Sequence, residues 1–262
     1  PEAQQFATYV GWLLHRTAGG LVAGILFVLP GAIVILGLSI LYTGYQDLSF
    51  VQAIFFGIKA AVLAVVIEAV LRIGKRALKN SFMFSLAAAA FVGLFFFKVP
   101  FPLVVVLAGL IGFVGGHLNP DKFVVFKSHE PDVNDETPMV DAALADGQLD
   151  HTRPSRARAV KVTVVCLALW LGPLAVLAAL LGLDHVYVQE GVFFSKMAVV
   201  TFGGAYAVLA YVAQEAVNNY GWLAPGEMLD GLGMAETTPG PLIMVVQFVG
   251  FMGAYRHPGV ID

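Results

Sequence analysis

Charged residues are scarce in this sequence. Asp, Glu, Lys and Arg make up 13% of its 262 residues and hydrophobic residues 58%, whereas a soluble domain has about a quarter charged and under half apolar residues. Of the 33 charges, 13 lie within residues 119–158, and the remainder is ten basic and ten acidic residues with no basic face for nucleic acid. The composition excludes a water-soluble enzyme and a nucleic-acid-binding protein, and it predicts an all-α polytopic membrane protein.

Cysteine is nearly absent as well. The one cysteine, Cys166, lies in an apolar run, which excludes a disulfide framework and a cysteine-based metal site. The sequence has no histidine spacing typical of a metal site, no P-loop, no dinucleotide fingerprint and no nucleophile elbow. We therefore expect no catalytic residues, no metal and no cofactor, and an ion gradient as the energy source.

Long apolar runs are abundant instead. A helix needs about 20 residues to cross a bilayer, and its backbone must form its hydrogen bonds internally. The runs predict six spans at residues 18–43, 51–71, 82–97, 103–118, 159–183 and 192–213. Pro30 and Gly31 interrupt the first run and predict a kink or break there.

Basic residues lie at alternate ends of these spans. Arg16, the cluster at 72–79 and the cluster at 153–161 all fall on one side of the membrane. Since cytoplasmic loops carry the excess of Lys and Arg, the hydrophilic loop 119–158 is expected to be cytoplasmic. Its acids and prolines indicate a solvated linker without chemistry of its own.

A modest internal repeat divides the chain. Pro1, the run Tyr9-Val10-Gly11-Trp12 and Arg16 match Pro241, the run Phe248-Val249-Gly250-Phe251 and Arg256. The repeat predicts a first half at 1–118 that lacks its beginning, the linker at 119–158, and a second half at 159–262 that lacks its end. If the Pro241 segment crosses the membrane, the halves form an inverted repeat, which we expect, and if it is re-entrant they are parallel.

The sharpest local feature is a Pro-Gly-Pro run between two short apolar stretches, 227–235 and 242–254. Proline disfavours a helix before it and suits a first helical position, and glycine bends freely. We expect a broken helix whose free amides at 242–244 attract an anion, although a simple proline kink explains the pattern equally well. The residues proposed to bind substrate here are Thr237, Thr238, Pro239, Gly240, Pro241 and Leu242.

Two further pairs of residues in apolar surroundings are candidates for substrate binding. Gln4 and Gln5 follow Pro1, where a matching helix would open, and they would bind substrate or form interhelical hydrogen bonds. Gly203 and Gly204 would expose amides at a second break or allow close helix packing.

Charges within the spans are costly enough to indicate function. Lys59 lies in mid-span and should bind an anion or pair with a carboxylate, whereas Lys196 binds an anion or extends to the interface. Glu68 and Arg72 are four residues apart and are expected to form an ion pair. The candidates for proton coupling are Glu2, Glu236 and Glu68.

Several blocks together resemble the chromate transporter family of bacterial membrane proteins. They are Pro1–Gln5, Tyr9–Trp12, Gly57–Leu63, Glu68–Arg72, Thr201–Ala207, Gly221–Leu223, Asp230–Leu232, Thr237–Pro241 and Phe248–Phe251. The resemblance, to the long two-domain type, implies chromate export across the bacterial inner membrane and chromate resistance. It also implies that Lys59, Gly203-Gly204 and Pro239-Gly240-Pro241 belong to the transport core.

The expected partners are chromate, sulfate as a related tetrahedral dianion, the lipid bilayer and a second copy of the chain in a homodimer. Transport of sulfate or another small anion is the alternative function. A membrane scaffold or enzyme without transport is a third, and it would require a reactive group of residues that the sequence does not show.

Overall fold

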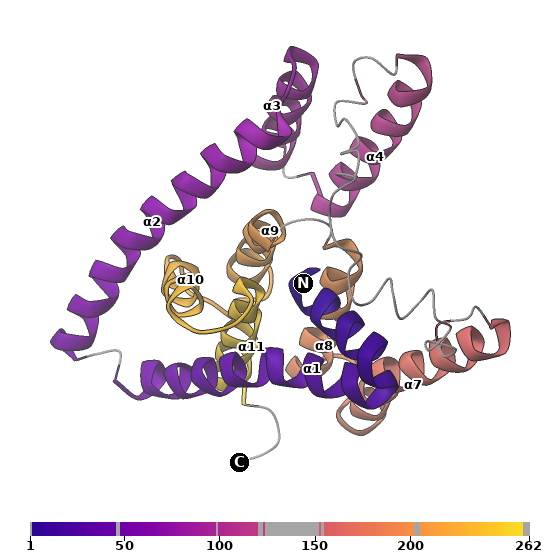
Figure 1. The fold of residues 1–262 in the computed structure, drawn as a ribbon. Coiled ribbons are helices and arrows are strands. Elements are labelled where there is room, and N and C mark those ends of the chain that lie inside the picture. The colour runs from indigo at the N-terminus through magenta and orange to yellow at the C-terminus, as the bar shows by residue number, and fades with distance from the viewer. Residues whose placement is uncertain are drawn as a thin grey trace. The chain divides into compact units, whose positions relative to one another are not determined.

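The computed structural model describes residues 2–45, 48–97, 99–119, 123, 152, 155–201 and 205–258. Most of the predicted linker 119–158 lies outside these residues. The chain divides into two compact units, residues 1–59 with 137–262, and residues 60–136. All regular elements within the described ranges are helices (Figure 1).

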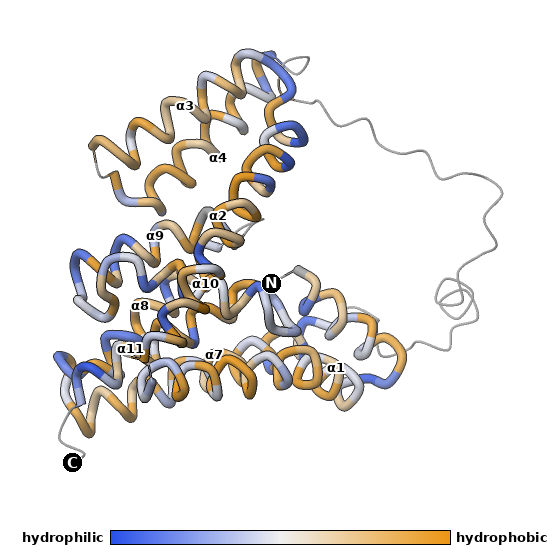
Figure 2. Tube along the Cα trace, turned by 90° about the vertical axis from the view of Figure 1, so that its left-hand side faces the viewer, coloured by the Kyte–Doolittle hydropathy of each residue, from blue (hydrophilic) through white to orange (hydrophobic). Residues whose placement is uncertain are grey.

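The helices follow one another without an intervening strand in the described residues. They are α1 (Glu2–Tyr45), α2 (Ser49–Ala77), α3 (Ser81–Phe95), α4 (Phe101–Leu118), α7 (Arg156–Leu181), α8 (Val186–Val200), α9 (Ala205–Asn218), α10 (Glu227–Thr237), the 3₁₀ turn η2 (Leu242–Met244) and α11 (Val245–Arg256). By length and composition, α1, α2, α4 and α7 are able to cross a membrane, and the hydrophobic colour runs along most of α3, α4 and α7 (Figure 2). The prediction of an all-α polytopic membrane protein is confirmed.

α1 consists of two helices joined by a sharp reversal. His15 and Arg16 leave helical geometry, with φ of −133° and 57°, and the segment before them folds back on the segment after them (Figure 1). A Cβ atom on Gly11 would lie 2.5 Å from the carbonyl oxygen of Gly19. These glycines therefore allow the two arms to pack backbone against backbone.

Of the kink or break predicted at Pro30, the break is wrong. The only non-helical dihedrals within α1 are those at the reversal, and the helix continues through Pro30. A proline keeps φ close to the helical value and removes one hydrogen bond, and membrane helices tolerate this loss when neighbouring helices support them.

The sixth predicted span, 192–213, is also wrong as one helix. α8 begins earlier, where the His185 ring accepts a hydrogen bond from the amide of Tyr187 at 3.3 Å. It ends at Val200, and Thr201 is extended, with its hydroxyl donating to the carbonyl of Met197 at 2.5 Å. α9 begins at Ala205, so the predicted span contains parts of two helices. Gly203 and Gly204 lie outside the described residues.

The unit of residues 60–136 contains α3 and α4, which correspond to the predicted spans 82–97 and 103–118. α3 and α4 pack against each other, and Asn80 caps α3 by accepting a hydrogen bond from the amide of Met83 at 2.8 Å. Neither helix has a buried residue, which suits a surface that faces lipid.

The buried core lies in the other unit, among α1 and α8–α11. Its largest fully buried side chains are Trp222, Phe248, Ile35 and Met234. α1 packs on α10, η2 and α11. α10 buries eight of its eleven residues, Glu227 and Asp230 among them, so this core encloses charge.

Candidate functional site

The broken helix predicted around the Pro-Gly-Pro run is present. α10 ends at Thr237, and Thr238 is extended, as the following proline requires. Gly240 has a φ of 143°, a conformation that side chains rarely adopt. Pro241 then precedes the 3₁₀ turn, which leads directly into α11.

The polar groups at this break are used within the chain. Thr237 donates its hydroxyl to the carbonyls of Gly233 and Met234 at 3.0 and 3.1 Å, and Thr238 donates to the carbonyl of Ala235 at 3.1 Å. These bonds cap α10 and leave the two hydroxyl groups as acceptors, whereas an oxyanion needs donors.

The amide predicted to be free at residue 244 is paired. Met244 donates to the carbonyl of Pro241 at 2.9 Å, because the chain leaves the break through a 3₁₀ turn, which forms its first hydrogen bond one residue earlier than an α-helix does.

The break is seated on α1. A Cβ atom on Gly31 would lie 2.7 Å from the carbonyl oxygen of Pro239, and the Cα of Gly240 lies 3.6 Å from that position. One turn beyond the break, the Gln247 side chain donates to the carbonyl of Ala32 at 2.9 Å. Gly31 therefore serves as a contact point for the break.

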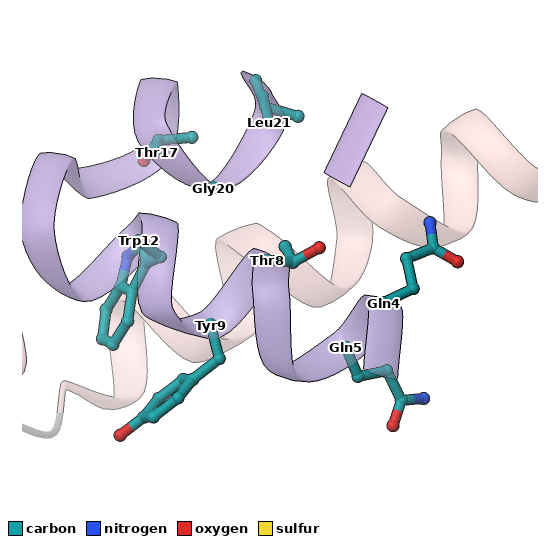
Figure 3. Close-up of a pocket in the computed structure, with 8 residues that line it drawn as sticks. All are labelled: Gln4, Gln5, Thr8, Tyr9, Trp12, Thr17, Gly20 and Leu21. Atoms are coloured by element: carbon teal, nitrogen blue, oxygen red, sulfur yellow. The ribbon is translucent and has the colours of Figure 1, made fainter. Parts of the chain in front are cut away.

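A groove runs along the two arms of α1. One part, of about 560 Å³, is lined by Gln4, Gln5, Thr8, Tyr9, Trp12, Thr17, Gly20 and Leu21 (Figure 3). A second part, of about 480 Å³, shares several of these residues and reaches Ala32, the neighbour of Gly31. The predicted glutamines thus line an open groove that leads toward the break.

Lys59 pairs with a carboxylate, one of the two outcomes predicted for it. Its Nζ lies 3.1 Å from Oδ2 of Asp230 on α10, and the hydroxyl of Tyr42 on α1 donates to the same oxygen at 3.1 Å. The Lys59 side chain is 38% exposed and that of Asp230 is 3% exposed. Oδ1 of Asp230 is buried and has no hydrogen-bond partner among the described residues.

A second ion pair lies one turn away on α10. Arg256 holds Glu227 with two parallel hydrogen bonds of 2.7 Å and also donates to the carbonyl of Trp222 at 3.0 Å. Glu227 in turn accepts from the amide of Ala224 at 2.7 Å. This bidentate geometry fixes the loop before α10 to the end of α11.

The other predicted residues lie apart from these groups. Lys196 is exposed on α8. Glu236 is exposed and accepts a hydrogen bond from the Tyr206 hydroxyl at 2.6 Å. Glu68 and Arg72 form the predicted ion pair on the exposed surface of α2. The Glu2 side chain lies outside the described part of the chain.

The structure does not bring Lys59 to the break. Asp230 and Thr238 are eight residues apart, which corresponds to about 12 Å along a helix. Tyr42 and Gly31 are similarly separated by eleven residues, or about 16 Å along α1. The site therefore has two parts, the groove with the break and the Lys59–Asp230 pair, and α1 connects them.

Two carboxylates were not predicted from the sequence as site residues. Asp230 stands in a short apolar stretch. Burying its charge is costly, and this cost, which identified Lys59, was also a signal for Asp230. Glu190 on α8 falls between two predicted spans, yet it faces α11 beside Gly250 and Gly253. The spacing of these two glycines on one helical face was the signal for Glu190.

Comparison with known proteins finds relatives among transporters. A family model described as chromate transporter matches residues 1–113 and 188–261. A chromate transport protein of Pseudomonas aeruginosa is 31% identical over 96% of this chain and 53% of its own length. A chromate transport protein of Cupriavidus metallidurans is 24% identical over 97% of this chain and 54% of its own length.

The chain thus spans about half the length of the curated relatives that it matches. No solved structure matches it. The family match covers well over half of the chain and includes Lys59, Asp230 and the Pro-Gly-Pro break. The chain belongs to the chromate transporter family.

Proposed function

We propose that this chain forms part of a secondary transporter that exports chromate across the bacterial inner membrane and so gives chromate resistance. The observation that carries the proposal is Lys59, a half-exposed cation in the middle of an apolar helix that is able to cross a membrane. A charge in that position is costly and is retained where it serves a substrate or ion pathway. The choice of chromate as the substrate rests on the relatives that are named chromate transport proteins.

The substrate path runs along α1. The groove between its two arms leads to Ala32 beside the break, and further along α1 Tyr42 reaches the Lys59–Asp230 pair. Gln4 and Gln5 offer amide donors at the entrance of this path, and Lys59 offers the positive charge that a dianion needs.

The chain contributes to both halves of the transporter. The family model matches on either side of residues 114–187, which supports a first half at 1–118, a linker at 119–158 and a second half at 159–262. The halves are inverted, the linker is cytoplasmic, and two copies of the transporter form a homodimer. Export uses an ion gradient and no catalytic chemistry.

The test is chromate accumulation in cells that carry the full-length protein. Accumulation should fall below that of cells without the protein, and Lys59→Ala or Gly240→Leu should abolish the difference. Lys75→Ala on the exposed end of the same helix is the matched control and should behave as wild type. Equal chromate accumulation with and without the wild-type protein would contradict the proposal.

Sulfate is the second candidate substrate. Lys59 is a point charge without the forked geometry that would select one oxyanion over another, so the pair with Asp230 suits any small dianion. Competition by sulfate against chromate uptake into everted vesicles distinguishes the two. Strong competition favours a general dianion transporter, and none favours chromate.

A further inference from the structure

We propose that the Asp230 carboxylate pairs with Lys59 as an internal counter-ion in the empty transporter. When the anion binds Lys59, Asp230 takes up a proton and leaves the ion pair. The inference rests on the proposed function and deepens it, because it assigns the coupling group and the stoichiometry. It differs from the coupling residues considered from the sequence, of which Glu236 and Glu68 are exposed and lie in other contacts.

The two members of the Lys59–Asp230 pair differ in their exposure. Asp230 is almost fully buried, whereas more than a third of the Lys59 side chain is accessible. An anion can therefore reach the ammonium group without displacing the helix that carries the carboxylate. The ammonium group of Lys59 is accessible, and the carboxylate of Asp230 is buried beneath it.

The hydrogen bonding of the Asp230 carboxylate is incomplete. Both of its partners, Lys59 and Tyr42, bind the same oxygen, Oδ2. Oδ1 is buried without a partner in the described part of the chain. A buried carboxylate in this state is held ionised by Lys59, so neutralising Lys59 with another anion favours proton uptake at Asp230.

The surrounding charges support the same exchange. Tyr42 faces Asp230 from α1, Lys59 faces it from α2, and Glu227 precedes it by one turn on α10. Arg256 from α11 is already bound by Glu227 in two hydrogen bonds. Lys59 is therefore the cation that compensates Asp230, and its loss to a substrate leaves Asp230 beside a second carboxylate.

The proton balance follows directly. The carboxylate of Asp230 accepts one proton and becomes neutral, while Lys59 keeps its protons and transfers its pairing to the dianion. The anion-bound transporter therefore carries one more net negative charge than the empty one.

The experiment measures chromate binding by the purified full-length protein between about pH 7.5 and 8.5, where chromate stays dianionic. If one proton is taken up with each anion, affinity should fall about tenfold per pH unit in wild type. Asp230→Asn should bind with an affinity that does not change with pH. Asp184→Asn, an exposed carboxylate between α7 and α8, is the control and should keep the wild-type slope.

Two outcomes would overturn the inference. One is an unchanged pH slope in Asp230→Asn, and the other is a flat slope in Glu236→Gln, which would assign the coupling to Glu236. Should Asp230→Asn fail to fold, proton uptake by wild type in weakly buffered solution decides, since the inference requires about one proton per chromate. Wild type that binds chromate without taking up protons contradicts the inference alone, and wild type that neither binds nor transports chromate contradicts the proposed function.

Discussion

α10 and α7 show opposite relations between burial and polarity. α10 buries eight of its eleven residues and carries two buried acids. α7 is a 26-residue apolar helix with no buried residue. In a soluble protein the buried helix would be the apolar one. Here the solvent for the exposed surface is lipid, so the polar groups lie where other protein groups can satisfy them.

The comparison extends to the ion pairs. The Arg256–Glu227 pair is bidentate and mostly buried, whereas the Arg72–Glu68 pair is exposed on both sides. The first holds the loop before α10 to α11, and the second joins residues one turn apart on the same helix. The two pairs should therefore differ greatly in their effect on stability.

The largest expected effect is loss of the buried pair. Arg256→Leu leaves Glu227 as an unpaired buried charge, which should cost about 3–5 kcal/mol of unfolding free energy. Arg72→Leu removes the exposed pair and should cost under about 1 kcal/mol. Thermal unfolding of the full-length protein in detergent measures both. Equal losses of unfolding free energy in the two variants would contradict the difference between the buried and the exposed ion pair.

A smaller effect is expected from adding a methyl group to the core. A Cβ atom on Gly231 of α10 would lie 2.5 Å from the ring of Phe248, so Gly231→Ala should destabilise the protein by about 1–3 kcal/mol. Gly109 on α4 has open space around it, and Gly109→Ala should be neutral or slightly stabilising. The unfolding midpoint should fall for Gly231→Ala and should stay unchanged or rise slightly for Gly109→Ala. A destabilised Gly109→Ala would show that α4 packs against protein and not lipid.

The smallest effect is expected on the exterior. Phe113 on α4 is 73% exposed, and Phe113→Leu keeps the surface apolar, so stability should change by no more than about 0.5 kcal/mol. Phe248→Leu in the core is the matched comparison and should cost clearly more. The same unfolding assay measures both variants, and a large loss in Phe113→Leu would indicate an unrecognised interface on α4.

The sequence predicts the long helices well because length and hydropathy alone decide them. The spans at 51–71 and 103–118 fall within α2 and α4, and the broken helix follows from the dihedral limits of Pro239 and Gly240. The reversal at Arg16 was not predicted, because it depends on contacts between two glycine-rich arms. A second break at Gly203 and Gly204 was one of two alternatives, and α8 ends at Val200, shortly before these glycines.

The candidate site was predicted in part for a similar reason. Lys59 was found because a mid-span charge stands out locally. Its pairing with Asp230 joins residues 171 positions apart, and tertiary structure alone establishes it. The hydroxyl groups of Thr237 and Thr238 were expected to face an anion, yet both cap α10, since a helix end competes for any nearby donor or acceptor.

Lys59 is central to the proposed transport because it is the group that binds the anion. Titration of chromate into the purified full-length protein should give at least a tenfold weaker affinity for Lys59→Ala than for wild type, or about 1.4 kcal/mol. Lys75→Ala on the same helix should match wild type. Equal affinities of wild type and Lys59→Ala would contradict the account.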